Sequence, residues 1–160
     1  MVVLPDDIGQ EDNQRYQRSA AGGDVQLNPK GREIGIARKV ALTDAGRDHP
    51  LYKGKANVFD AICVHKDAIT TLPNGATVLA GNSLAEIQAL EIKHNSGTFW
   101  GVQYHPEYDL REVGRVALRY GDALVKEGLF ANKEAVSTYA SMTETLSANP
   151  KRQDIAWLLG

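Results

Sequence analysis

The stretch Gly101-Val102-Gln103-Tyr104-His105-Pro106-Glu107 constrains the fold of this chain more than any other segment. Its first residues predict a short apolar β-strand, and Pro106 ends sheet pairing there because proline has no backbone N–H to donate. Side chains alternate between the two faces of a strand, so we expect His105 and Glu107 to leave it on the same side. The carboxylate can then hold one ring nitrogen of His105 while the other takes a proton from a nucleophile. The alternative is that both are ordinary polar residues at the surface.

The apolar pattern changes to a helical period directly behind this strand. Asp109 and Glu112 have capping-box spacing, which predicts a helix start, and Gly128 predicts its end. Asn132 is expected to cap a second helix, and Asn149-Pro150 to begin a short third one. We interpret the apolar positions of the first two helices as core contacts: Leu110, Val113, Ala117, Tyr120, Leu124, Ala135, Tyr139, Met142 and Leu146.

The central third of the chain is predicted to be sheet. Alternating or β-rich segments separated by turn residues indicate strands at 34–42, 69–72, 77–80, 87–92 and 98–104. Pro73-Asn74-Gly75 is a strong turn signal, and His94-Asn95-Ser96-Gly97 is typical of a hairpin loop.

Composition limits the possible functions. A length of 160 residues suits one domain, 1–160, and 18 basic against 20 acidic side chains gives no electrostatic footprint for nucleic acid. Cys63 is the single cysteine, which excludes an internal disulfide and fits a reducing compartment. No apolar run approaches the ~20 residues of a membrane helix. We therefore expect a cytoplasmic protein without a membrane or nucleic-acid partner, and no pattern indicates a cofactor.

Residues 99–107, FWGVQYHPE, resemble the G-x-Q-[FY]-H-P-E signature of class I glutamine amidotransferases. Four further segments follow the order of the stand-alone, GMP-synthase-like branch of that family: residues 28–35, 59–72, 76–80 and 87–90. The resemblance as a whole covers Ser19 to Gly160. It implies an α/β fold, a flavodoxin-like three-layer sandwich around a largely parallel sheet. It also implies a Cys-His-Glu triad in which His105 is the catalytic base and Glu107 orients it. The implied ligand is glutamine or a glutamine-like small molecule, and the ammonia acceptor depends on a synthase partner.

The nucleophile of that triad is not found where the resemblance places it. The family carries its cysteine in a G-x-C-x-G-x-Q elbow before a helix that ends in small residues, and Ala20-Ala21-Gly22-Gly23 resembles that ending. Counting back from Gly23 leads to Glu11, within Gly9-Gln10-Glu11-Asp12-Asn13, and a carboxylate cannot replace a thiolate there. We therefore expect an N-terminally incomplete domain. Missing strands would uncover sheet edges, so we predict that the chain self-associates, binds a partner or pairs a strand at Met1–Leu4 with the sheet.

The segment Ala61–Asp67 resembles the family's S-H-x-D element, whose backbone helps to hold the glutamine substrate. His65 and Asp67 match it, and the resemblance assigns them to substrate binding rather than to chemistry. We interpret Cys63 as a small buried hydrophobe, against the alternative of a reactive thiol near His65. The charged residues of the loop at 28–35, namely Lys30, Arg32 and Glu33, are interpreted as solvated loop residues outside the catalytic set.

Three hypotheses remain open at this point. The first is glutamine amide hydrolysis with a cysteine supplied from elsewhere, and it leaves open whether this polypeptide is itself an active enzyme. The second is a catalytically inactive binding or regulatory relative. The third is a metal site built from His65, His105, Glu107 and Asp109, but that set has no ligand-spacing signature, and we assign no metal ligands.

Overall fold

The computed structural model describes residues 2–3 and 22–159, so the expected elbow position at 9–13 lies outside the described residues. The elements in chain order are β1 Val2–Val3, β2 Asp24–Leu27, β3 Glu33–Leu42, α2 Asp44–Arg47, the 3-10 turn η1 Pro50–Tyr52, β4 Val58–His65, β5 Asp67–Thr71, β6 Ala76–Gly81, β7 Ala89–His94, β8 Gly97–Val102, α3 Leu110–Arg119, α4 Gly121–Lys126, α5 Lys133–Ala148 and α6 Gln153–Leu158. The predicted change from strands to helices after the His-Pro-Glu segment is confirmed.

Six strands form one sheet in the order β1-β8-β7-β6-β3-β4, and β2 pairs with β5 in a second, two-stranded sheet. Among the described strands only β1 and β8 pair in parallel, so the expectation of a largely parallel sheet is wrong for this part of the chain. The connections explain the difference. β7 and β8 are joined by Asn95-Ser96 alone, with Asn95 at φ 52°, and so short a connection can join only antiparallel neighbours.

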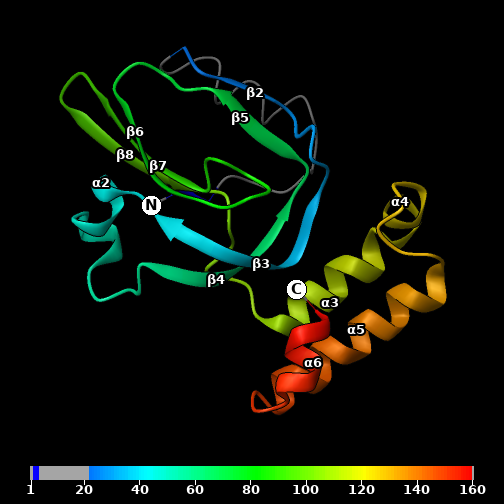
Figure 1. Cartoon of the computed structure of the whole chain (residues 1–160). Helices are drawn as coiled ribbons and strands as arrows, with labels where there is room; N and C mark the ends of the chain where they lie inside the picture. The colour runs from blue at the N-terminus through cyan, green and yellow to red at the C-terminus, as the bar shows by residue number, and fades with distance from the viewer. Residues whose placement is uncertain (1, 4–21, 160) are drawn as a thin grey trace.

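The six-stranded sheet curls until the chain beyond β8 reaches the outer edge of β4 (Figure 1). Tyr104 pairs there with Cys63, and the backbone N–H of His105 donates to the carbonyl of Ile62 at 2.7 Å. This contact covers part of the β4 edge.

The opposite end of the sheet carries the short strand β1. Val2 pairs with Gly101 and Val3 with Val102, so a segment of the predicted Met1–Leu4 strand does add to the sheet. The edge of β8 is thereby paired at these two positions, which is one of the ways we expected a sheet edge to be covered.

The main hydrophobic core lies inside the curled sheet. Its fully or nearly fully buried members come from β3, β4, β6, β7 and β8 and from the segments beside them: Ala37, Val40, Leu42, Tyr52, Cys63, Leu79, Ala80, Ala89, Val102 and Tyr104. Burial along the first residues of β3 alternates with the two-residue period of a strand, as its sequence predicts.

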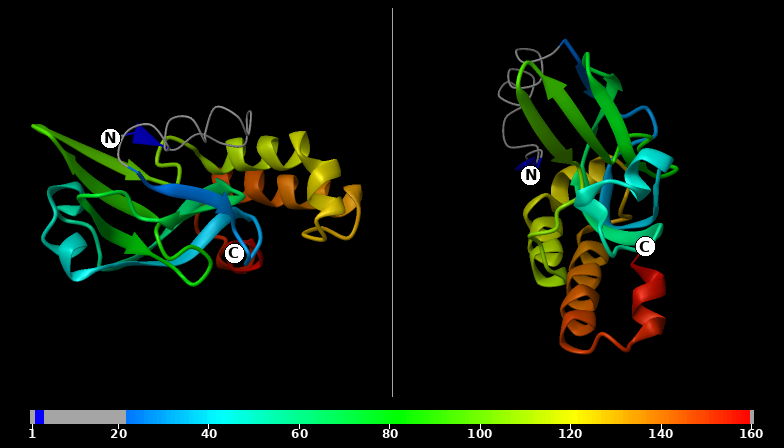
Figure 2. Two further views of the ribbon diagram at one scale, coloured as in Figure 1. Left: turned by 90° about the horizontal axis from the view of Figure 1, so that it is seen from above. Right: turned by 90° about the vertical axis from the view of Figure 1, so that its left-hand side faces the viewer.

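The helices α3 to α6 gather beside β3 and β4, whereas α2 lies against β6 (Figures 1 and 2). Asp109 caps α3 by accepting from the N–H of Glu112 at 2.9 Å, and Asn132 caps α5 by accepting from the N–H of Ala135 at 2.9 Å, which confirms both predicted starts. The single helix expected up to Gly128 is instead two, α3 and α4, which meet at Tyr120. The last helix begins at Gln153 rather than at Asn149-Pro150.

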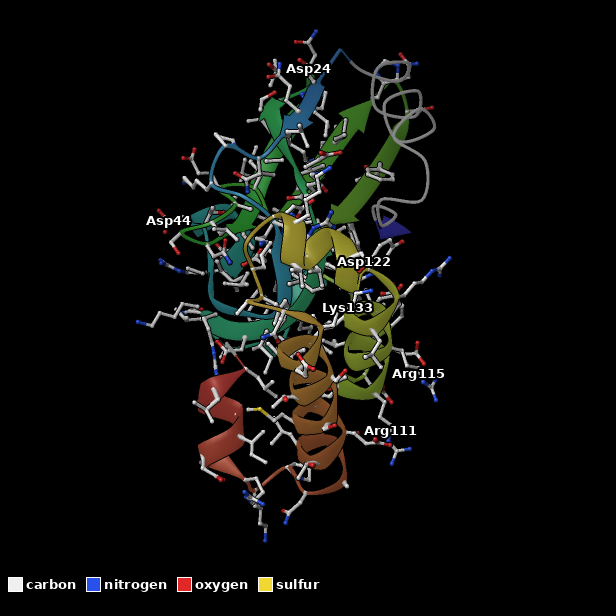
Figure 3. The ribbon with its side chains drawn as sticks, turned by 90° about the vertical axis from the view of Figure 1, so that its right-hand side faces the viewer. Asp24, Asp44, Arg111, Arg115, Asp122 and Lys133 are labelled. Atoms are coloured by element: carbon white, nitrogen blue, oxygen red, sulfur yellow. The ribbon has the colours of Figure 1, made fainter. Side chains whose placement is uncertain are left out.

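Helix α3 packs on α5 and contacts β3 and β4, so it lies between the sheet and solvent. Figure 3 shows Arg111 and Arg115 pointing away from the body of the protein on the outer side of α3. Asp122 of α4 and Lys133 of α5 form an ion pair at 2.7 Å where those two helices meet (Figure 3). None of the described helices combines the length and the apolar character needed to cross a membrane.

Candidate active site

His105 and Glu107 form a hydrogen-bonded pair. The distance from His105 Nδ1 to Glu107 Oε1 is 2.7 Å, the imidazole is 3% exposed and the carboxylate side chain is 46% exposed. The geometry differs from a simple extended strand, because β8 ends at Val102 and the N–H of Tyr108 donates to the carbonyl of His105 at 3.3 Å. A turn therefore brings the carboxylate back to the ring, and the two-residue spacing predicted the pair although the backbone between them is not a strand.

The position of His105 is determined by contacts with three parts of the chain. The backbone N–H of His105 donates to Ile62, as described above. The preceding residue, Tyr104, pairs with Cys63, and its hydroxyl lies 3.0 Å from that of Tyr52. The ring of Tyr108 stacks on the imidazole, with 4.5 Å between ring centroids and 17° between planes. The imidazole is thus restrained at its backbone, at Nδ1 and on one ring face.

A second polar cluster lies where β3 begins and β4 ends. It consists of the buried residues Glu33, His65 and Gln88 and the half-buried Asn82. Glu33 and His65 are register partners of antiparallel strands, and Glu33 Oε2 lies 2.9 Å from His65 Nε2. Gln88, which is fully buried, donates to Glu33 Oε2 at 2.6 Å, and Asn82 donates to Glu33 Oε1 at 2.6 Å. One carboxylate therefore contacts three side chains that are far from it in the sequence.

The surroundings of Glu33 favour its charged form. Burial by itself would raise the pKa of this carboxyl, but the hydrogen bonds from His65 and Asn82 and the charge of His65 together hold its pKa below the ordinary value. His65 Nδ1 lies 3.1 Å from the carbonyl oxygen of Asp67, so it donates there. The ring consequently faces an acceptor on both sides, the Asp67 carbonyl and the Glu33 carboxylate.

The structure places His65 and Asp67 beside each other, and both make contacts within the protein. The His65 side chain is only 9% exposed and makes an internal ion pair, and Asp67 takes part through its carbonyl, which also accepts from Gln103 Nε2 at 3.4 Å. Their assignment to substrate binding stays a prediction.

Cys63 is a buried thiol, in agreement with its interpretation as a small hydrophobe. It is 0% exposed, and its Sγ lies 3.7 Å from Gln88 Oε1. Burial, and then the neighbouring Glu33 charge, raise the pKa of the thiol far above its usual range. Because the thiolate is the nucleophilic form, Cys63 in this setting is not an activated nucleophile.

Two loop residues that we interpreted as solvated are buried, so that interpretation is wrong for Arg32 and Glu33. Arg32 Nε lies 2.9 Å from Glu127 Oε2, and this pairing, with the hydrogen bond from Lys66, lowers the pKa of Glu127. Lys30 is half exposed, as expected.

Glu33 is the main site residue that the sequence interpretation missed. The sequence pattern did not indicate its burial, because the most apolar positions of this segment, Ile34 and Ile36, lie on the other face of the strand.

The metal set suggested by the sequence is divided in the structure. His65 pairs with Glu33, His105 pairs with Glu107, and Asp109 caps α3. Within the described residues these four side chains do not form a group with converging donor atoms.

Residues 18–121 match the family model described as glutamine amidotransferase class-I. The chain is 40% identical over 114 residues to a Pseudomonas protein named gamma-glutamyl-L-1-hydroxyisopropylamide hydrolase, an alignment that covers 69% of this chain and 38% of that protein. It is 32% identical over 93 residues to a glutamine-hydrolyzing GMP synthase subunit from Methanocaldococcus jannaschii, covering 56% of this chain and 48% of the relative. The chain therefore spans less than half the length of either protein.

The fold is also similar to that of a solved glutamine amidotransferase from Thermotoga maritima, with a TM-score of 0.53 and 21% sequence identity over 78% of this chain and 51% of that one. This likeness confirms the predicted mixed α/β, flavodoxin-like architecture. Because the family model covers most of the chain, including the His-Pro-Glu segment, the chain belongs to the class I glutamine amidotransferase family.

Proposed function

We propose that this chain provides the histidine and glutamate of a Cys-His-Glu triad that hydrolyses a γ-glutamyl amide. The observation that carries the proposal is the 2.7 Å pair between His105 and Glu107, held on a buried backbone beside β4. A carboxylate on Nδ1 keeps the proton there and leaves Nε2 as the basic nitrogen. That is the arrangement a general base needs.

In the proposed reaction a cysteine thiol gives its proton to His105 Nε2, and the thiolate sulfur attacks the amide carbonyl carbon of the substrate. His105 then passes the proton to the leaving nitrogen as the C–N bond breaks, which releases ammonia or an amine and leaves a thioester. His105 next takes a proton from water, whose oxygen attacks the thioester and releases the carboxylate and the thiol. Glu107 orients the ring throughout.

The cysteine in this scheme is not Cys63, because that thiol is buried and strongly disfavoured as a thiolate. A cysteine from polypeptide beyond the matched region, or from a second chain, has to supply the sulfur. This requirement also favours the second candidate function, an inactive binding relative in which the His–Glu pair remains without a nucleophile.

The names of the relatives suggest the substrate class. One is named as the hydrolase of a γ-glutamyl amine conjugate and the other as a glutamine-hydrolyzing synthase subunit. Both names imply an amide formed at the γ-carboxyl group of a glutamyl residue. We therefore propose a γ-glutamyl amide as substrate, glutamine included, and propose a synthase partner if the product is transferred ammonia.

A chimera tests the proposal directly. The part of the Pseudomonas relative that precedes the alignment would be fused to this chain, and the release of ammonia or amine from glutamine and from γ-glutamyl-L-1-hydroxyisopropylamide would be measured. If His105 is the base, His105→Asn should lower kcat by about 10²–10⁴-fold with intact folding. The matched control is His49→Asn, which removes another histidine that is paired with a carboxylate, at 3.2 Å from Glu91, and it should leave kcat unchanged.

Equal activity of the chimera and its His105→Asn variant would show that His105 is not the base. A folded chimera that binds glutamine but releases no product would support the inactive relative instead. In the isolated chain, an adduct with an electrophilic glutamine analogue that disappears in Cys63→Ala would contradict the exclusion of Cys63.

A further inference from the structure

Three side chains with metal-binding donor atoms converge inside the protein, away from the His105–Glu107 pair. Glu33, Cys63 and His65 each offer one donor atom, these atoms all lie within 4.8 Å of one another, and all three residues are buried. Their positions follow from the register of the sheet. Cys63 and His65 are two residues apart on β4, and Glu33 on β3 is the direct partner of His65. All three side chains therefore lie on one face of the sheet.

Both ring nitrogens of His65 face oxygen atoms of the protein, one a carbonyl and the other a carboxylate. Nδ1 faces the Asp67 carbonyl at 3.1 Å and must carry a proton to bond there. Nε2 lies 2.9 Å from Glu33 Oε2 and 3.5 Å from the side-chain nitrogen of Gln88. Either a hydrogen on Nε2 or a metal ion can join the ring to this carboxylate.

His49 forms a histidine–carboxylate pair with a different set of partners. Its Nδ1 accepts from the N–H of Leu51 at 3.2 Å, and its Nε2 lies 3.2 Å from Glu91 Oε2. The His65 pair differs because its Nδ1 partner is an acceptor, and because a sulfur lies beside it.

We propose that Glu33, Cys63 and His65 bind a zinc ion, through one carboxylate oxygen, Sγ and Nε2. These are the donor types that zinc prefers in proteins, and three protein ligands are a common zinc set. Binding releases the thiol proton and the proton shared by His65 and Glu33. The charges of the zinc ion, the thiolate and the carboxylate then sum to zero, and the imidazole is neutral. The buried site therefore carries no net charge.

The groups around the three ligands are those expected to orient them. A metal-bound histidine usually donates its second ring N–H to a carbonyl or carboxylate, as His65 does to Asp67. A ligating carboxylate is usually hydrogen-bonded in turn, as Glu33 is by Asn82 and Gln88. The ion would join β3 to β4 at the start of β3, and β4 also carries Ile62, the backbone partner of His105.

Cobalt(II) provides the test, because it replaces zinc and reports sulfur ligation by a near-ultraviolet charge-transfer band. The whole chain, reduced and freed of metal with a chelator, would be titrated with Co²⁺ and then with Zn²⁺ in competition. We expect the wild-type chain to bind one equivalent of Co²⁺ and to show the thiolate charge-transfer band. The variant Cys63→Ser should lack that band and bind Co²⁺ at least ~100-fold more weakly. His49→Asn, the matched control, should leave the band and the affinity unchanged.

A zinc-edge X-ray absorption spectrum of the wild-type protein gives a second answer that does not depend on any variant. One sulfur among nitrogen and oxygen ligands would support the site. A folded wild-type protein that binds no Co²⁺, a cobalt complex without the thiolate band, or a zinc shell without sulfur would each overturn the proposal.

Discussion

Replacing Glu33 by leucine should destabilise this protein strongly, because the carboxylate is the common acceptor of a buried cluster. The change removes the partner of His65 and leaves the amide donors of Asn82 and Gln88 without their acceptor. The side chains of Glu33 and His65 are each 9% exposed, so water cannot readily replace the lost contacts.

Breaking a buried ion pair by removing one partner costs about 3–5 kcal/mol. Each buried donor that loses its acceptor costs about 1–3 kcal/mol, but these penalties overlap with the loss of the pair and do not add in full. We therefore expect the free energy of unfolding to fall by about 4 kcal/mol. With a urea dependence of about 2 kcal/mol per molar, the unfolding midpoint should move by about 2 M.

The assay is a urea titration in the presence of a chelator, in which circular dichroism monitors unfolding. The control Glu86→Leu removes an exposed carboxylate, paired with Lys30 at 3.5 Å, and should cost less than about 1 kcal/mol. The pH dependence has a defined sign. Since the pKa of Glu33 is lowered on folding, its contribution is fully present above its ordinary value of 4.5 and is lost as pH falls through the folded pKa.

The wild-type protein should thus lose stability faster than Glu33→Leu on acidification below about pH 4.5, and the difference between them should narrow. At neutral pH, a difference in the free energy of unfolding below about 1 kcal/mol between the wild type and Glu33→Leu would refute the prediction that the hydrogen bonds of this buried cluster stabilise the protein. A difference that stays constant through the acid range would refute the attribution to the Glu33 charge.

Further predictions use local features of the fold. Gly31 and Gly35 have φ of 95° and 97°, but only at Gly35 would a methyl group collide with the Tyr139 hydroxyl. Replacing Gly31 by alanine should lower the free energy of unfolding by about 1–2 kcal/mol. The same change at Gly35 should lower it by about 1–3 kcal/mol more, and urea unfolding measures both. Asn132→Ala should remove the α5 cap and cost about 1 kcal/mol in the same assay, and an unchanged midpoint would contradict that role. The buried thiol of Cys63 should react with a thiol reagent only through unfolding, so rapid labelling of the native protein would show that it is accessible. Self-association also stays a prediction, and sedimentation velocity showing a compact monomer at all concentrations would contradict it.

The local parts of the candidate site were predictable because they depend on contacts between near neighbours. The two-residue spacing of His105 and Glu107 led to the pair that the structure contains, although a turn rather than a strand brings them together. Asp109 and Asn132 were found as helix caps because a cap requires one side chain and an N–H three residues later. The boundary at Tyr120 was missed since the apolar period continues through it.

The Glu33 cluster could not be predicted from the sequence. Ile34 and Ile36 are the most apolar positions at the start of β3, and only the structure shows that the more buried face is that of Glu33. Its partners could not be read from the sequence, because His65 is 32 residues away and Gln88 is 55 residues away. Their meeting depends on the register of β3 against β4, where a shift by one residue would turn the side chain to the other face.

The sequence by itself determined the alternation of the strands, the helix caps, and the presence of a histidine and a carboxylate close enough to pair. All of these depend on backbone geometry and hydrogen bonds within a few residues. Only the tertiary structure decided that the sheet curls until Tyr104 meets Cys63, and that His65 faces an acceptor on either side of its ring. These outcomes depend on strand register and on burial away from water, where a polar group must find a partner within the protein, and that partner can come from any part of the chain.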